Sequence, residues 1–193
     1  MARGERVTAL DLPEAKDPDP DNAAYFQKFL DKLGLVPNVL RAYAWNQRKL
    51  RNFIALYNEL MLGESGLTKL ERKMIAVAVS AANRCYYCEV AHGAALRELS
   101  GEPELGEALA LNYRVAALPP RQRAMLDFAV MLTEQSHRID DAERARLREV
   151  GFSDADIFDI CDVAGFFGMS NRVASGIDMV PNREYHAMAR GKS

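Results

Sequence analysis

Residues 67–92 read LTKLERKMIAVAVSAANRCYYCEVAH, and this stretch decides the fold because it predicts two consecutive helices that carry a chemical motif. Thr68 and Glu71 have the spacing of a capping box, in which each side chain accepts a hydrogen bond from the other residue's backbone. A helix is therefore expected to begin there. Asn83 is expected to end that helix and to cap the next one, over residues 84–99.

Outward from this stretch, the chain predicts further helices separated by glycine and proline. Asp21 or Asn22 is expected to cap a helix that Gly34 ends. No alternating pattern of useful length predicts a strand. The sequence therefore predicts an all-α, single-domain helical bundle over residues 21–193, after a proline-rich extended arm over residues 1–20. The expected helices cover residues 21–33, a short segment from 38, a longer one ending at Gly63, 68–82, 84–99, 103–112, 119–135, 140–150 and 153–176.

Composition and charge exclude several classes of protein. The 193 residues are 49% hydrophobic with a formal net charge of -2, which argues against disorder and against a nucleic-acid-binding surface. The apolar run Met74–Ala82 is far shorter than the ~20 residues that span a bilayer. Residues 1–15 have no apolar core, so no secretory signal is expected. We therefore expect a cytoplasmic protein with no membrane or nucleic-acid partner.

Cys85, Cys88 and His92 form the one pattern in the chain with a chemical interpretation. On a helix they stand at i, i+3 and i+7 and share one face. Two thiols that can form a disulfide then lie beside a base, as thiol redox chemistry requires, because the thiolate is the attacking species. A peroxide oxidises one sulfur to a sulfenic acid, the other sulfur condenses with it, and an external thiol or dithiol reduces the disulfide.

The identity of the nucleophile stays open at this point. Asn83 as the cap would place Cys85 in the first helical turn, where the helix dipole favours a thiolate. Cys88 lies four residues before His92, so the imidazole favours Cys88. Tyr87 either lines the route to the thiols or packs in the core, and the same alternatives hold for Tyr86.

A structural zinc site is the main alternative for a C-x-x-C pair near a histidine. Zinc prefers four ligands, and the remaining candidates have no ligand-like spacing to the motif, so neither metal nor cofactor is expected. Cys161, which lies among apolar residues, is expected to be an inert core thiol. The remaining candidate ligands are Cys161, His137 and His186.

A resemblance to a known family is carried by three stretches of sequence. These are Leu67-Thr68-x-x-Glu71-Arg72-Lys73-Met74-Ile75-Ala76 running into Asn83-x-Cys85-x-x-Cys88-x-x-x-His92, Gly34-Leu35-Val36-Pro37-Asn38, and Phe166-Phe167-x-Met169-x-Asn171-Arg172-Val173-Ala174. They resemble the alkyl hydroperoxidase D family of the carboxymuconolactone decarboxylase-like superfamily, and its uncharacterised peroxidase-related branch in particular. The resemblance covers roughly residues 22–186.

The resemblance implies a homo-oligomeric, all-helical peroxidase that reduces an organic hydroperoxide without metal or haem. It implies that Cys88 meets the peroxide, that Cys85 closes the disulfide and that His92 belongs to a proton relay. Two relay groups of the family differ here: the glutamate position is Lys73, and the histidine position before the second cysteine is Tyr87.

Two other functions compete with a peroxidase or disulfide oxidoreductase. A lyase or isomerase of the decarboxylase branch would not need the cysteine pair. A non-enzymatic redox sensor would cycle the two thiols without turnover.

Overall fold

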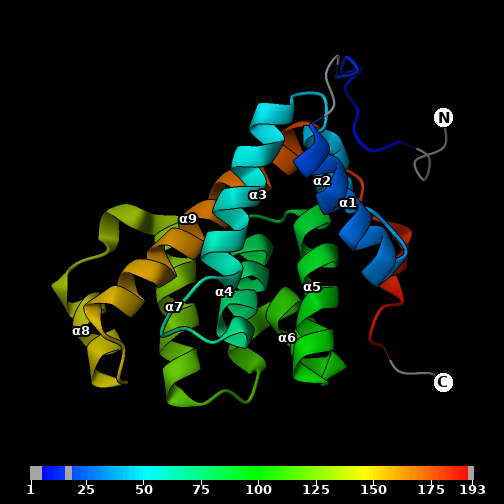
Figure 1. Ribbon diagram of the computed structural model, residues 1–193. Helices are drawn as coiled ribbons and strands as arrows, with labels where there is room; N and C mark the ends of the chain where they lie inside the picture. The colour runs from blue at the N-terminus through cyan, green and yellow to red at the C-terminus, as the bar shows by residue number, and fades with distance from the viewer. Residues whose placement is uncertain (1–5, 16–18, 191–193) are drawn as a thin grey trace.

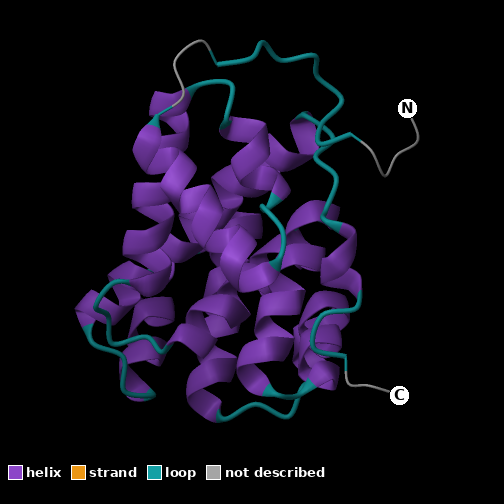
Figure 2. Ribbon diagram, turned by 45° about the vertical axis from the view of Figure 1, so that its right-hand side comes forward, coloured by secondary structure: helices purple, strands orange, loops and turns teal. Residues whose placement is uncertain are grey.

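The computed structural model describes residues 6–15 and 19–190, and within them every regular element is helical (Figures 1 and 2). This confirms the all-α prediction. Two short 3₁₀ segments, Tyr113–Val115 and Ser136–Arg138, join α-helices, and a third, η3 (Arg183–His186), follows the last α-helix. The α-helices are α1 (Pro20–Leu33), α2 (Asn38–Tyr43), α3 (Gln47–Leu62), α4 (Lys69–Ala82), α5 (Tyr86–Ser100), α6 (Pro103–Asn112), α7 (Pro120–Gln135), α8 (Asp141–Glu149) and α9 (Asp154–Gly176).

Helix α4 lies at the centre of the bundle, where it packs against α5, α6, α7 and α9 (Figure 1). The expected capping box begins it: the Thr68 amide donates to Glu71 Oε2 at 2.8 Å, and the Glu71 amide donates to Thr68 Oγ1 at 3.1 Å. Residues 74–79 are each at most 2% exposed. A helix that is apolar on every side is buried on every side, so α4 forms the middle of the core.

The start of α1 differs from the prediction. Its N-cap is Asp19, whose side chain accepts from the Asp21 amide, and Pro20 is the first helical residue. Proline suits that position because its ring presets the helical φ and its missing N–H has no partner there in any case. Asn22 instead donates to the Gln47 side chain at 2.9 Å. Gly34 ends the helix with a φ of 70°, as predicted.

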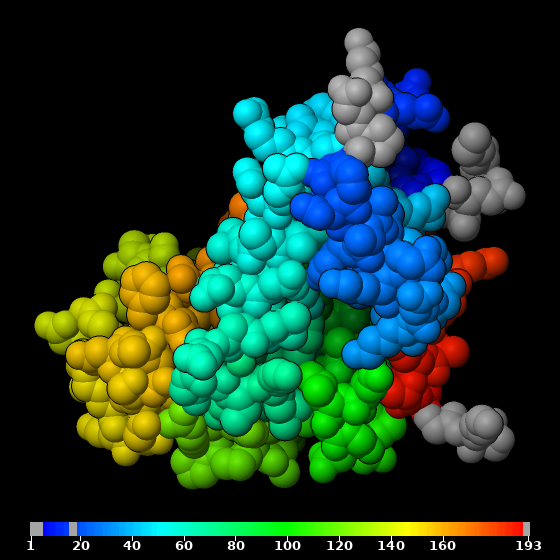
Figure 3. Space-filling model, in the orientation of Figure 1, coloured from blue at the N-terminus to red at the C-terminus, as the bar shows by residue number. Residues whose placement is uncertain are grey.

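Segments from both ends of the chain pack along α5. The Val39 amide of α2 donates to Tyr87 Oη at 3.0 Å, and Arg97 of α5 donates to the Tyr185 carbonyl at 2.8 Å. In Figure 3 the atoms of α1 and of the segment after it lie over this part of the bundle, next to the C-terminal segment. Helix α5 is therefore held near both of its ends by contacts from distant parts of the sequence.

Residues 6–15 of the predicted arm contain no helix, and the arm's residues 1–5 and 16–18 lie outside the described residues. The Val180 amide donates to the Val7 carbonyl at 3.0 Å, and the Ala9 amide donates to the Ile177 carbonyl at 2.9 Å. The arm is thus attached to the chain that follows α9. None of the helices described is long and apolar enough to cross a membrane.

Candidate active site

The turn between α4 and α5 places the first cysteine outside the helix. Asn83 ends α4 but does not cap α5 as predicted, because its side chain donates to Asn171 Oδ1 of α9 at 2.9 Å. Arg84 then adopts a left-handed φ of 52°, which turns the chain. Cys85 itself is the N-cap of α5, with φ -88° and ψ 98°. The prediction that Cys85 lies within the first helical turn is therefore wrong, while Cys88 lies in that turn.

Both cysteines of the motif are buried next to each other as free thiols. Cys85 and Cys88 are each 1% exposed to solvent. They share a small apolar cluster with residues from α2 and from the end of α9, and Val7 of the arm packs against it. Water is therefore largely excluded from the two sulfur atoms.

The contact between the two thiols separates their pKa values. A hydrogen bond from the Cys88 side chain lowers the pKa of Cys85 to about 6, against the effect of burial, and the Cys88 backbone amide acts in the same direction. Because the Cys88 thiol donates that bond, and because it is buried, the pKa of Cys88 is raised. The N-cap position of Cys85 also favours a negative charge, because the unpaired backbone amides at the start of the helix point at it. The resting pair therefore holds its charge on Cys85.

This arrangement predicts a thiolate that titrates well below the usual range for cysteine. Thiolate absorbance near 240 nm is expected to appear with an apparent pKa of about 6 in the reduced protein, so the charge is lost as the pH falls through that value. Cys85→Ser should remove this transition, and Cys161→Ser should leave it in place. A first thiolate that appears only above pH ~8.5, the ordinary range for cysteine, would contradict the assignment.

Asn171 of α9 connects the motif to the core, and neither Asn171 nor Ser170 was predicted from the sequence as a site residue. The Asn171 side chain donates to Ser80 Oγ at 3.0 Å and is 1% exposed. It also hydrogen-bonds both cysteines, while Ser170 hydrogen-bonds Cys88. The signal in the sequence was the amide side chain of Asn171 within a largely apolar part of α9, because a buried amide needs hydrogen-bond partners.

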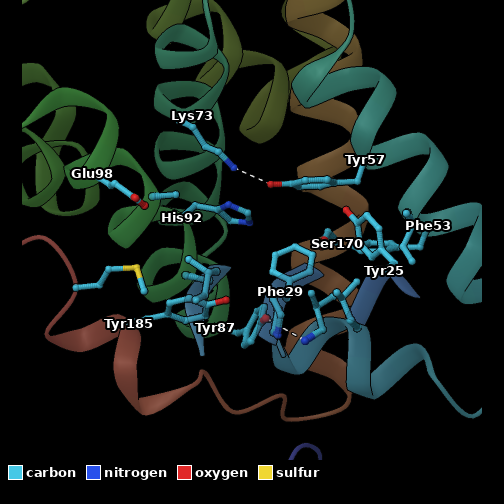
Figure 4. Close-up of a pocket in the computed structure, with 18 of the residues that line it drawn as sticks. Tyr25, Phe29, Phe53, Tyr57, Lys73, Tyr87, His92, Glu98, Ser170 and Tyr185 are labelled. Carbon is cyan, nitrogen blue, oxygen red and sulfur yellow. Dashed lines mark hydrogen bonds between the residues drawn. The ribbon is translucent and has the colours of Figure 1, made fainter. Parts of the chain in front are cut away.

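An aromatic pocket lies beside the motif (Figure 4). It encloses about 160 Å³, and three predicted residues, Lys73, Tyr87 and His92, line it. Cys85 and Cys88 do not line it. Tyr87 and Ser170 belong to the pocket wall and also adjoin Cys88, so they stand between the cavity and that thiol. The other lining residues are Tyr25, Phe29, Leu33, Pro37, Val39, Leu40, Phe53, Ile54, Tyr57, Ala91, Ala95, Glu98, Phe166, Tyr185 and Met188.

The polar side of the pocket is formed by α3, α4 and α5. Lys73 Nζ donates to Tyr57 Oη at 2.7 Å, and the ring nitrogens of His92 face the same space (Figure 4). Burial and the nearby Lys73 charge hold the pKa of His92 well below its usual range, so the imidazole is neutral. Its ring contacts Phe167 edge-on, with centroids 4.7 Å apart. Within the described residues, no hydrogen bond joins His92 to either thiol.

The remaining cysteine and histidines, which were weighed as metal ligands, lie apart from the cysteine pair and the pocket. Cys161 is half-buried, and burial raises its pKa, in keeping with an inert thiol. His137 is exposed, and His186 stacks near Tyr86 on the surface with ring centroids 6.2 Å apart. In the ranges 6–15 and 19–190, no three side chains of the metal-binding types come together.

Comparison with known proteins identifies the family. Residues 49–115, which include the motif, match the Carboxymuconolactone decarboxylase family. An uncharacterised peroxidase-related protein from Silicibacter sp. TM1040 is 57% identical, with a TM-score of 0.94 over 98% of this chain and 100% of that one. A second one, from Ralstonia eutropha JMP134, described as an alkylhydroperoxidase AhpD core, is 44% identical with a TM-score of 0.92 over the same shares.

The fold extends to more distant proteins. The debrominase Bmp8, solved as a C82A variant with 2,3,4-tribromopyrrole, has a TM-score of 0.76 at 18% identity over 94% of each chain, which shows a shared fold only. No protein with a curated description matches the chain. The two closely similar structures span the whole length of the described bundle, and the chain belongs to the alkylhydroperoxidase AhpD-like proteins of the carboxymuconolactone decarboxylase family.

Proposed function

We propose that the protein is a cysteine-based peroxidase that reduces an organic hydroperoxide and is regenerated by a thiol or dithiol. The observation that carries the proposal is the buried pair Cys85–Cys88, in which one pKa is lowered and the other raised, beside an apolar pocket. The names of the similar structures support it. Such a cycle needs a reducing compartment, and we place the protein in the cytoplasm.

Cys88 is the sulfur that meets the peroxide in this proposal, because it adjoins the pocket residue Ser170, whereas Cys85 adjoins Ser175 of the opposite, solvent-facing side. The Cys88 proton moves to the Cys85 sulfur, and the Cys88 thiolate attacks the terminal peroxide oxygen. The O–O bond breaks, Cys88 becomes a sulfenic acid, and the alkoxide takes up a proton through His92. Cys85 then attacks the sulfenic sulfur, forming a disulfide and water. Two external thiols return the pair to the reduced state.

Steady-state consumption of cumene hydroperoxide with dithiothreitol tests the proposal. The wild-type protein is expected to consume many equivalents of hydroperoxide per chain. The double variant Cys85→Ser, Cys88→Ser should consume hydroperoxide no faster than dithiothreitol alone. Consumption of a single equivalent, with no further turnover, would indicate the redox sensor instead.

One observation favours a second candidate function, a lyase or isomerase. His92 and Lys73 face the pocket directly, whereas the cysteines do not line it. An imidazole and an ammonium group can exchange protons with a bound acid without help from sulfur. The double serine variant separates the two functions, since a lyase or isomerase would keep its full activity.

We further propose that the protein is a homo-oligomer in which the outer face of α9 is buried. Phe158 is 65% exposed and Met169 is 44% exposed. Met169 comes eleven positions after Phe158, which places both on one face of the helix. Burying such a face against a symmetry mate is the usual outcome for a surplus apolar surface.

Light scattering is expected to give a multiple of 21.5 kDa at micromolar concentration. Phe158→Asp should lower the mass toward that of one chain, whereas Leu30→Asp, at an exposed position on α1, should not. A wild-type mass of one chain at all concentrations would refute the assembly.

A further inference from the structure

The ammonium group of Lys73 is unusual among the charges of this protein because it lies in an apolar cavity. It donates to Tyr57 Oη at 2.7 Å and lies 5.2 Å from the centroid of that ring. In the described chain no carboxylate comes within ion-pair distance of it. Glu98 also lines the pocket, but it is exposed to solvent and lies on the far side of His92 from the Lys73 ammonium (Figure 4).

A partly buried ammonium group with a single neutral partner can make further charge-assisted hydrogen bonds. It has three N–H donors, and the Tyr57 hydroxyl occupies one of them. The neighbouring imidazole of His92 is neutral, so it neither cancels the charge nor adds to it. An anionic group that enters the pocket would pair with Lys73 in surroundings of low dielectric, where such a bond is stronger than in water.

We infer that the pocket binds a single-ring or similarly small apolar carboxylate, with the carboxylate on Lys73 and the apolar body against the aromatic walls. The size is set by the cavity of about 160 Å³, since a cavity of about 150 Å³ in another protein accommodates benzene. The walls on which a ring would lie come from α1, α3 and α9: Tyr25, Phe29, Phe53 and Phe166.

The position of Lys73 also sets where the reacting group of such a ligand lies. Lys73 is beside His92, and His92 comes four positions after Cys88 on α5, which corresponds to about 6 Å along the helix axis. A carboxylate held at Lys73 therefore leaves the opposite end of the ring directed toward Ser170 and Tyr87, the residues in front of Cys88. The binding of a carboxylate does not depend on the proposed function. If the peroxidase proposal holds as well, the end of the ligand near Cys88 carries the hydroperoxide, and the substrate is an aryl hydroperoxide that bears a carboxylate.

Calorimetric binding of 4-isopropylbenzoate tests the inference without any turnover, because this probe has the carboxylate and no peroxide. Lys73→Met is expected to weaken its binding about 10- to 100-fold, the usual effect of losing a hydrogen bond to a charged group. Lys73→Arg should keep the affinity for the acid. The neutral analogue 4-isopropylbenzyl alcohol should bind more weakly than the acid and respond little to Lys73→Met.

The matched control is Lys69→Met, which removes an exposed lysine one turn earlier on α4 and should change affinity by no more than about twofold. Equal binding of acid and alcohol by the wild-type protein would overturn the inference, and so would an acid affinity that Lys73→Met leaves unchanged. Either result leaves the peroxidase proposal standing. Conversely, acid binding that depends on Lys73 in a protein without peroxide turnover would sink the peroxidase proposal alone.

Discussion

Replacing Cys88 with serine is expected to reduce hydroperoxide turnover by at least ~10³-fold, because the nucleophile of a covalent mechanism cannot be replaced by its neighbours. A serine hydroxyl keeps the hydrogen bond toward Cys85 but does not ionise near neutral pH. The remaining Cys85 thiolate adjoins Ser175 and not the pocket, so it should react slowly with a bulky hydroperoxide. Steady-state rates with cumene hydroperoxide and dithiothreitol measure the loss.

Cys85→Ser should behave differently from Cys88→Ser although it also lacks the disulfide. Cys88 can still react once with peroxide, and without a partner sulfur it should stop at a sulfenic acid that a dimedone probe labels. Cys161→Ser is the matched control and should retain the wild-type rate, because its half-buried thiol is remote from the motif. If Cys88→Ser keeps the wild-type rate while Cys85→Ser loses it, the roles assigned to the two cysteines are reversed.

His92→Gln is expected to slow the peroxide reaction by ~10²–10⁴-fold, the usual contribution of a proton-transfer group. The low pKa of His92 keeps the imidazole neutral near pH 7, so one ring nitrogen can give its proton to the alkoxide while the other takes one up. Glutamine preserves the size and polarity of the side chain but cannot exchange the proton.

Stopped-flow traces across the neutral range decide this prediction. Phe167 contacts the imidazole edge, so the variant's thermal stability should be measured alongside the rate. An unchanged peroxide rate and an unchanged cysteine pKa would mean that His92 is a packing residue. Lys73→Met separates the two polar pocket groups, since it removes the charge and leaves the imidazole in place.

The sequence predicted the elements whose signals are local. Thr68 and Glu71 form hydrogen bonds within three residues, so their pattern predicted where α4 begins. The same kind of local pair, Ser153 with Asp156, begins α9 close to the expected residue 153. The Glu71 carboxylate is occupied by the cap of α4 and by the 3.3 Å ion pair to Arg121. Glu71 therefore has a structural role and does not replace the relay glutamate of the family.

The errors occurred where a distant residue decides the outcome. Asn83 was expected to cap α5, but Asn171, 88 residues later, binds its side chain and leaves Cys85 as the cap. The aromatic pocket escaped prediction for the same reason, because its walls come from α1, α3, α5 and α9 and no short pattern connects them. Lys73 and Tyr87 were singled out as departures from the family pattern, and both line that pocket.

Free-thiol counting after a hydroperoxide pulse tests the central claim most directly. The reduced protein should lose two thiols per chain on reaction with one equivalent of cumene hydroperoxide, and peptide mass mapping should find the bond between Cys85 and Cys88. Dithiothreitol should restore both thiols and permit a second pulse with the same result. Loss of no thiol, or a stable bond between Cys88 and Cys161 or between chains, would contradict the account.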